Sequence, residues 1–415
     1  MQDQKLRECF YLFICRALFL CLLTLTLCVA VGASTTTTTT STTTTAINSP
    51  DGDIIDCTEI LAQPAFRHPL LKDHKLQEVP RNLPNTAKNE DGVSGWQIWN
   101  SRNGSKCPEG TIPIRRVVSQ DNGDTNEGTI PIRRVGSQEN EATNSGAEDE
   151  LTRGHEYAIA HLNSTTKIYG TKVTMSVGHP KVAQPGEFSL GQLWLTSGSV
   201  ERGDMNTIEA GWQIYPSVYL DDQPRLFIFW TNDAYTIEKC ENLRRPGFIQ
   251  TSGNVLVEGA IHPHTEVITI QIWKDPNLGH WWLSVGPNSG TVLIPVGYWP
   301  REIFTCLTDH AESVQWGGEI IDKYVSGQHT TTQMGSGYLP SSAKAAYMRD
   351  LEIMVNTGNF QPAYDLVVGE TNPDYYNIKK TSDTSFSYGG PESGAVHLRV
   401  NLVFLYLCFS LFLHL

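Results

Sequence analysis

Basic residues are scarce in this 415-residue chain, and their scarcity limits its partners. Lysine and arginine together number 31 against 44 aspartates and glutamates, which gives a formal charge of −13 at pH 7. A chain this acidic repels a phosphate backbone, so we expect no nucleic-acid partner. Hydrophobic residues make up 40% of the sequence, too many for a disordered chain and enough for one large domain or two smaller ones.

Cysteine is scarcer in the foldable part of the chain than its total count suggests. Of nine cysteines, five lie near the two ends of the chain: Cys9, Cys15, Cys21, Cys28 and Cys408. The four that remain are Cys57, Cys107, Cys240 and Cys306. A small domain held mainly by disulfides is therefore not supported, although Cys57 and Cys107 are candidates for one pair.

The common catalytic motifs are absent as well. The sequence contains no G-x-S-x-G, H-E-x-x-H, P-loop, G-x-G-x-x-G or C-x-x-C motif. A serine or cysteine nucleophile is therefore unsupported, and Cys306 is interpreted as a core thiol. His262-Pro-His264-Thr-Glu266 would place candidate ligands on one face of an extended segment, but no other ligand cluster accompanies it. We predict no metal and no cofactor.

The N-terminus has the features of a secretory signal in residues 1–33. Lys5, Arg7 and Arg16 precede the apolar run Ala17–Val31, which is short for a membrane span and is closed by small residues. We therefore expect a secreted, extracellular protein. Two glycosylation sequons, at Asn103 and Asn163, fit this route.

The C-terminal residues 392–415 form an atypical hydrophobic tail. Leu402–Leu415 is almost wholly apolar, and the small residues Ser393-Gly394-Ala395 lie upstream of it. One interpretation is a lipid-anchor signal that attaches the protein to a membrane, although the spacer is short and contains Arg399. The other is an aberrant end left by gene rearrangement. The sequence leaves both open.

Changes in composition divide the rest of the chain. Residues 34–51 are interpreted as a linker, because the unbroken Thr and Ser run Thr35–Thr45 cannot bury apolar surface. Residues 52–117 form a compact unit. Glu109–Asn126 (EGTIPIRRVVSQDNGDTN) recurs as Glu127–Asn144 (EGTIPIRRVGSQENEATN), and two copies are too few for a solenoid. Residues 118–150 are therefore predicted to be a duplicated, acidic and exposed linker.

Residues 151–391 show the pattern of an antiparallel β-sandwich. Apolar and polar residues alternate in short runs, as at Val173, Met175 and Val177, and turn residues separate the runs. Further strands are predicted at 188–196, 225–231, 267–272, 281–285, 291–299 and 351–355. A helical pattern occurs at most at Ile303–Val314. Eight of the ten tryptophans lie here, which also suggests an aromatic-lined groove.

Two single glutamates stand in apolar, Gly- and Trp-rich surroundings. Glu209 lies in NTIEAGWQ (206–213) and Glu319 in QWGGEI (315–320). If their side chains converge, one holds a proton while the other stays ionised, and such a pair can deprotonate water and protonate a leaving group. The alternative is two structural glutamates at strand ends, each bonded to backbone amides.

The same residues belong to a longer set of motifs in which the chain resembles the plant neprosin family of glutamic endopeptidases. The resemblance runs from about Asp53 to Pro391 and begins with DIIDCTEILAQPAFRHPL (53–70), CPEGTIPIRR (107–116) and HEYAI (155–159). It continues in family order with NTIEAGWQ (206–213), FIFWTNDAY (227–235), IWKDPNLGHWW (272–282), VGYWP (296–300), QWGGEI (315–320) and TQMGSG (332–337).

This resemblance implies a β-sandwich with a cleft across one sheet and with Glu209 and Glu319 as the catalytic glutamates. It implies a secreted precursor whose N-terminal activation segment, residues 52–117, acts as its inhibitor. The mature form would cleave proline-containing peptides or proteins after proline in acid. Aromatic faces suit a proline ring and glutamine can bond a peptide backbone, so the candidate substrate contacts, each of which could equally be core, are Trp212, Gln213, Tyr219, Trp230 and Gln333.

The chain departs from the family pattern at its cysteines. The second cysteine that usually follows the one matching Cys240 is replaced by Arg244-Arg245-Pro246, and the family's C-terminal pair is absent. Loss of a native disulfide costs about 2–5 kcal/mol. The chain could therefore be a weakly active or inactive paralogue, and its alternative function is that of an extracellular module that binds glycan or peptide in a tryptophan-rich groove.

Overall fold

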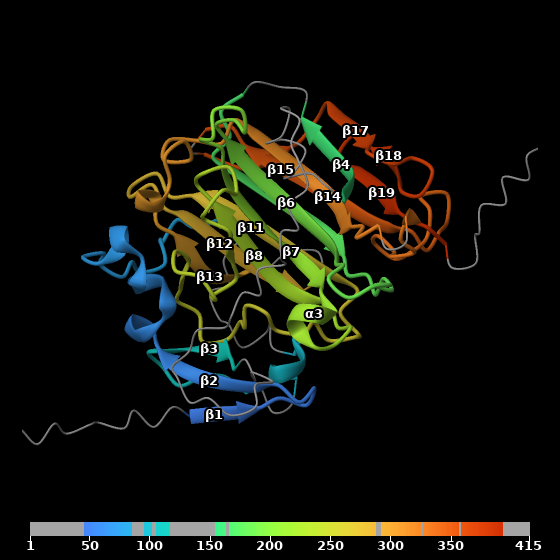
Figure 1. The fold of residues 1–415 in the computed structure, drawn as a ribbon. Coiled ribbons are helices and arrows are strands. Elements are labelled where there is room, and N and C mark those ends of the chain that lie inside the picture. Colours follow the sequence, from blue (N-terminus) through green and yellow to red (C-terminus); the bar gives the residue numbers. More distant parts are fainter. Residues whose placement is uncertain are drawn as a thin grey trace, which may run out of the picture. The chain divides into compact units, whose positions relative to one another are not determined.

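Three antiparallel sheets make up almost all the regular structure of the chain (Figure 1). The computed structural model describes residues 45–84, 95–101, 105–116, 154–162, 166–287, 292–324, 327–356 and 358–392, all within one compact unit at 44–415. The predicted all-β fold class is confirmed. No helix in these ranges is long and apolar enough to cross a membrane.

Several predictions lie outside the described residues and stay predictions. They concern the signal peptide, most of the Thr-rich linker, the duplicated linker at 118–150, the tail from residue 393, and both sequons, Asn103 and Asn163. The last residues of the expected linker are described, because Thr45–Asn48 forms a strand that pairs with the next one.

The seven-stranded sheet carries both candidate glutamates. Its strand order is β17 (Leu366–Glu370), β4 (His155–Leu162), β14 (Ser313–Ile321), β6 (Ser189–Ser197), β7 (Asn206–Ile214), β8 (Arg225–Thr231) and β9 (Cys240–Glu241). Every residue of β7 is buried, although its sequence alternates between apolar and polar side chains. The strand is therefore covered on both faces, and Thr207, Glu209 and Gln213 lie on the face that points away from the second sheet.

The second large sheet has nine strands. Its order is β10 (Ile249–Gln250), β13 (Ile294–Trp299), β12 (Trp281–Pro287), β11 (Val267–Lys274), β5 (Gly170–Ser176), β15 (Ala346–Met354), β19 (Ser385–Gly389) and β18 (Asn377–Ser382), with β16 (Gln361–Pro362) paired to β15. β11 and β12 are apolar along most of their length and wholly buried apart from Pro287. Figure 1 shows β11–β13 behind β6–β8, as in a β-sandwich.

Tryptophans of the seven-stranded sheet join it to the second sheet. The indole Nε1 of Trp212 donates to the carbonyl oxygen of Ser176 at 2.9 Å, and that of Trp316 donates to Thr171 Oγ1 at 3.1 Å. Both acceptors lie on β5. The two indoles thus combine large apolar burial with a hydrogen bond across the core.

Core packing also overturns the expectation of a tryptophan-lined groove. Seven of the eight expected tryptophans are at most 2% exposed, namely Trp212, Trp230, Trp273, Trp281, Trp282, Trp299 and Trp316. All seven belong to the main hydrophobic core. They are packed in the interior, on both faces of the nine-stranded sheet, because a large apolar side chain gains most when it is fully removed from water.

The first part of the chain, residues 45–116, is called here the N-terminal segment. It contains a three-stranded sheet of β1 (Thr45–Asn48), β2 (Ile54–Glu59) and β3 (Thr111–Arg115), and short 3₁₀ turns η1 (Ile60–Ala62), η2 (Pro64–Arg67), η3 (Pro69–Leu71) and η5 (Ile98–Asn100). Cys57 and Cys107 form a disulfide, so that predicted pair is confirmed. Cys240 and Cys306 are free thiols.

Polar contacts dock the N-terminal segment on the sandwich. Gln63 exchanges hydrogen bonds with the backbone of Gln250, and Gln97 bonds the backbone of Leu256 in the same two-way manner. His74 Nε2 lies 3.0 Å from the hydroxyl oxygen of Tyr298. Paired buried polar groups of this kind fix one docking position, because each would be costly to leave without its partner.

The tentative helix at Ile303–Val314 is wrong. Only the 3₁₀ turn η6 (Arg301–Ile303) is present, and β14 begins at Ser313. The side-chain oxygen Oδ1 of Asn206 accepts the backbone N–H groups of Thr305, Cys306 and Leu307 at 2.9, 2.8 and 3.1 Å. Those N–H groups are thereby satisfied without a helix.

We predict that Trp212→Phe destabilises the sandwich by about 2–4 kcal/mol, because it removes a bond to Ser176 and leaves a cavity. Urea unfolding measures the change. Ile237→Ala is the control, since Ile237 is 77% exposed and its truncation should leave the midpoint unchanged. Equal midpoints for Trp212→Phe and the parent chain would contradict this account of the core.

Candidate active site

Glu209 and Glu319 emerge on the same face of the seven-stranded sheet. Strand β6 lies between their two strands, with Leu190 opposite Glu319 and Trp194 opposite Glu209. Directly opposed residues share a face, and alternate residues along a strand share a face. Leu190, Gln192 and Trp194 therefore point the same way, and Gln192 stands between the two glutamates.

Gln192 contacts both carboxyl groups. Its Nε2 donates to Glu319 Oε2 at 3.2 Å, and its side chain also hydrogen-bonds Glu209. Gln192 is 1% exposed, and its Oε1 has no hydrogen-bond partner among the described residues. A buried acceptor of this kind needs a donor, which a water molecule or a substrate amide can supply.

Two glycines keep other side chains away from Gln192. Gly317 and Gly211 lie directly opposite it on the two neighbouring strands. A Cβ atom on Gly211 would lie 2.0 Å from the carbonyl oxygen of Gly191, and one on Gly317 would lie 2.2 Å from that of Ala158. No larger residue fits at either position, which explains physically why both the EAGWQ and the QWGGEI motif carry glycine there.

Glu209 is a buried acid held by three hydrogen bonds. Its Oε1 accepts from Thr207 Oγ1 at 2.9 Å and from the hydroxyl of Tyr235 at 2.8 Å. Burial, and after it the charge of Glu319, raise the pKa of Glu209 to about 7, although the bonds from Tyr235, Thr207 and Gln192 oppose the rise. At acidic pH this carboxyl group therefore carries a proton.

Glu319 has a different set of neighbours. Its Oε1 lies 2.5 Å from His155 Nδ1, while Gln192 bonds its other oxygen. Tyr157 stands directly opposite Glu319 on β4, and the ring of His155 stacks on that of Tyr157. Burial, then the charges of Glu319 and Glu209, raise the pKa of the Tyr157 phenol well above its usual value, so this hydroxyl stays a neutral donor.

A raised pKa alone does not define the site. Burial also raises the pKa of Glu241 to about 7, and Glu241 lies on β9 opposite Phe229. The charges that affect Glu241 belong to Arg244 and Glu258, however, and an arginine neighbour favours its ionised form. Glu241 shares the face of Glu209, across Phe229, and what distinguishes Glu209 is the amide of Gln192, which links it to a second carboxyl group, Glu319.

The alternative of structural glutamates at strand ends is not what the structure shows. Glu209 and Glu319 lie inside β7 and β14 and bond side chains. Trp212 and Trp230 are placed in the core, on the opposite face from Glu209, so their contacts are packing contacts. Neither tryptophan is therefore among the proposed substrate contacts.

The other candidate contacts come from different elements: Gln213 from β7, Tyr219 from the short helix α3 (Pro216–Tyr219), and Gln333 from a segment outside the strands. Gln213 shares the face of Glu209 and accepts a bond from the Tyr219 hydroxyl at 3.0 Å, and both are buried. Gln333 accepts from the backbone N–H of Lys181 at 3.0 Å and donates to the carbonyl of Pro391 at 3.3 Å. Gln213 therefore stays a candidate beside the glutamates, whereas the described bonds of Gln333 are to backbone.

Sequence reasoning missed the partners of the two glutamates and a cluster of side chains that could hold a metal ion. His155, Tyr157, Gln192 and Tyr235 come from other strands or loops. His262 and His264 have rings 5.0 Å apart, but they gather no third ligand among the described residues. A group of three candidate metal ligands occurs instead at Glu156, Asp322 and His329.

Two family models match the chain. The family model described as Neprosin matches residues 185–391, and the one described as Neprosin activation peptide matches residues 46–161. The chain belongs to the neprosin family, which is peptidase-related, and the resemblance in sequence is confirmed. Its organisation is that of a protease-like precursor, with an activation peptide ahead of the Neprosin domain.

A solved structure titled "The crystal structure of native glycosidic hydrolase" is also similar to part of the chain. It is 9% identical, and the match covers 41% of this chain and 78% of that one at a TM-score of 0.18. At this TM-score the similarity carries no argument about fold or activity.

We predict that Tyr235→Phe raises the pKa of Glu209 above about 7, because it removes one of the hydrogen bonds that lower it. Carboxyl ¹³C resonances of glutamate-labelled protein, assigned with Glu209→Gln, measure the titration. Tyr215→Phe serves as the control, because it makes the same substitution at a tyrosine that does not bond Glu209. An unchanged or lower pKa in Tyr235→Phe would contradict the assigned hydrogen bond.

Proposed function

We propose that the mature chain is a secreted endopeptidase that hydrolyses peptide bonds at acidic pH with water activated by Glu209 and Glu319. The observation that carries this proposal is the buried carboxyl pair on one face of the sheet, linked through Gln192. The preference for bonds after proline rests on the family resemblance. Secretion rests on the apolar N-terminus.

The different surroundings of the two glutamates suggest their roles. Glu209, with its pKa raised to about 7, is protonated in acid and serves as the general acid. Glu319 receives the Gln192 N–H on one oxygen and lies against His155 on the other, which suits a carboxylate that accepts a proton. Oε1 of Gln192 would hold the water between them.

The protonation states of the two glutamates determine the steps of the proposed reaction. Glu319 takes one proton from the water, and the resulting hydroxyl attacks the carbonyl carbon of the scissile bond. Protonated Glu209 donates a hydrogen bond to the developing oxyanion and afterwards gives its proton to the leaving nitrogen. The C–N bond breaks, the acyl part leaves as a carboxylic acid, and the amine leaves neutral. No covalent intermediate forms.

The N-terminal segment would inhibit this site in the precursor. Asp53 accepts hydrogen bonds from Arg115 of the same segment at 2.8 Å and from Arg225 of β8 at 2.7 Å. Arg225 stands opposite Gln213 on the face that carries Glu209, and its side chain is fully buried. Release of the segment would therefore uncover one end of that face.

The glycan-binding alternative has lost its main support. It rested on a tryptophan-rich groove, and all but one of the tryptophans counted for it fill the core. Trp194, at 7% exposure, remains on the face of the glutamates.

We predict that Glu209→Gln and Glu319→Gln each lower hydrolysis of a proline-containing peptide in acid by at least about 10²-fold, because each removes a proton carrier. Rates come from chromatography of the products of matured protein. Glu241→Gln is the matched control, a glutamate of equally raised pKa outside the pair, and should keep parental activity. Parental rates in either test variant, or equal losses of activity in all three variants, would refute the catalytic role of Glu209 and Glu319.

We also predict that acid weakens docking of the N-terminal segment. Burial lowers the pKa of His68 and of His74, and it lowers the pKa of His280 on the facing sandwich to about 4, while Glu238 and Glu302 oppose these shifts. The released state therefore binds more protons, so docking is strongest above the ordinary histidine pKa of about 6.5 and is lost progressively as pH falls toward about 4.

Limited proteolysis of the segment in the Glu209→Gln background measures this release, because that variant should not cleave itself. His74→Gln keeps a polar partner for Tyr298 but cannot gain the charge, so it should become sensitive to protease at lower pH than the parent. His264→Gln changes an exposed histidine on the loop that bonds Trp96 of the segment. It should behave as the parent, because His264 is none of His68, His74 and His280. Protection that is the same at pH 7 and at about pH 4 would refute the histidine account.

A further inference from the structure

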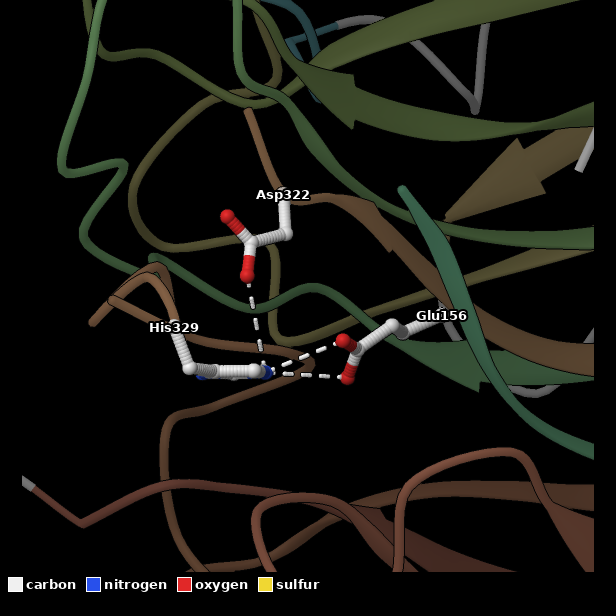
Figure 2. Close-up of side chains that lie close together, drawn as sticks. All are labelled: Glu156, Asp322 and His329. Carbon is white, nitrogen blue, oxygen red and sulfur yellow. Dashed lines mark hydrogen bonds and ion pairs between the residues drawn. The ribbon is translucent and has the colours of Figure 1, made fainter. Parts of the chain in front are cut away.

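Glu156, Asp322 and His329 meet behind one edge of the seven-stranded sheet (Figure 2). Glu156 belongs to β4, Asp322 follows the end of β14, and His329 lies on the segment that leads toward Met334. One ligand atom from each lies within 4.8 Å of the others. His329 Nε2 is 3.0 and 3.1 Å from the two carboxyl oxygens of Glu156 and 3.8 Å from Asp322 Oδ2.

The tautomer of His329 leaves Nε2 facing the acids. Its other ring nitrogen, Nδ1, is 2.7 Å from the carbonyl oxygen of Thr330. A carbonyl oxygen only accepts, so Nδ1 carries the hydrogen. The ring is held in this orientation by stacking on Tyr375, with centroids 3.5 Å apart. A histidine that donates through one nitrogen to a backbone carbonyl presents the lone pair of the other to a metal.

The charges around Nε2 favour a divalent cation over a proton. Glu156 and Asp322 are only 4% and 3% exposed, and Glu187, at 1%, bonds the neighbouring Thr330 hydroxyl at 2.7 Å. One proton on His329 supplies a single positive charge against these buried carboxylates. A divalent ion balances Glu156 and Asp322 together, and buried charges are otherwise very costly.

We propose that Glu156, Asp322 and His329 bind a divalent metal ion, with Zn²⁺ the best fit. One imidazole nitrogen with carboxylate oxygens suits zinc, and in tetrahedral zinc sites the ligand atoms are about 3.3 Å apart, near the separation of His329 from Glu156. His262 and His264, which the sequence offered as ligands, are not involved. The ligands come from segments far apart in the chain, which is why sequence spacing did not reveal them.

The position of the ion gives it a structural role behind the proposed active site. Glu156 lies between His155 and Tyr157 on β4, and these two point to the opposite face, toward Glu319. Asp322 directly follows the strand that carries Glu319. The ion would tie β4 to the end of β14 and so fix the neighbours of Glu319. It takes no part in proton transfer.

Zinc titration of the untagged full chain near pH 7, after dialysis against a chelator, tests the proposal. Calorimetry should show one Zn²⁺ per chain, and thermal unfolding should move to higher temperature with added ZnCl₂. His329→Gln and Glu156→Gln should each weaken binding by at least about tenfold. His264→Gln should bind as the parent does, and so should Glu209→Gln, which separates this result from the peptidase proposal.

Circular dichroism of each variant establishes that it is folded, and Asp322→Asn replaces any variant that is not. Failure of the folded parent to bind Zn²⁺ would overturn the proposal and leave His329 as an ion-paired imidazolium. Binding that is equally strong in His329→Gln and Glu156→Gln, or that is lost in His264→Gln, would overturn it as well.

Discussion

The burial of two carboxyl groups on one face of the seven-stranded sheet is the constraint on which the rest of this structure depends. Burial disfavours the charged form of Glu209 and the nearby charge of Glu319 adds to that effect, so the pKa of Glu209 is raised to about 7. Gln192 touches both groups, and the positions directly opposite it on the two adjoining strands are the glycines Gly211 and Gly317. Without that pairing, the proposed acid chemistry has no basis in this chain.

The opposite face of the same strands holds the pair in place. Trp212 and Trp316 reach across the core to β5, each with a hydrogen bond as well as a large buried surface. Since they alternate along β7 and β14 with residues of the acidic face, packing on one side fixes geometry on the other. The two tryptophans therefore support the site from the core side, and the polar residues of the opposite face form the site itself.

Much of the fold could be predicted from local alternation, and much of the site could not. The strand predicted at 225–231 matches β8, and Glu209 and Glu319 stood out because single acids are unusual in apolar, glycine-rich motifs. Strand parity could also have placed Trp212 in the core, because an odd separation from Glu209 puts the two on opposite faces. Gln213, at an even separation, shares the face of Glu209.

The partners of the glutamates depend on strand pairing between distant segments, which no local pattern encodes. Tyr157 is opposite Glu319 only because β4 pairs with β14, and Tyr235 reaches Glu209 from a loop after β8. The supposed helix at Ile303–Val314 failed for a similar reason: a distant residue, Asn206, takes its N–H groups. These features are determined by strand register and by hydrogen bonds between distant side chains, and hydrophobic periodicity reports neither.

The dependence of kcat/KM on pH tests the central claim most directly. Matured protein would be assayed on a proline-containing peptide from acid to about pH 9, and this profile reports the ionisations of the free enzyme. If protonated Glu209 is the general acid, kcat/KM is high in acid and falls as pH rises through about 7. Activity that stays level to about pH 9, or that appears only above about 7, would contradict the account.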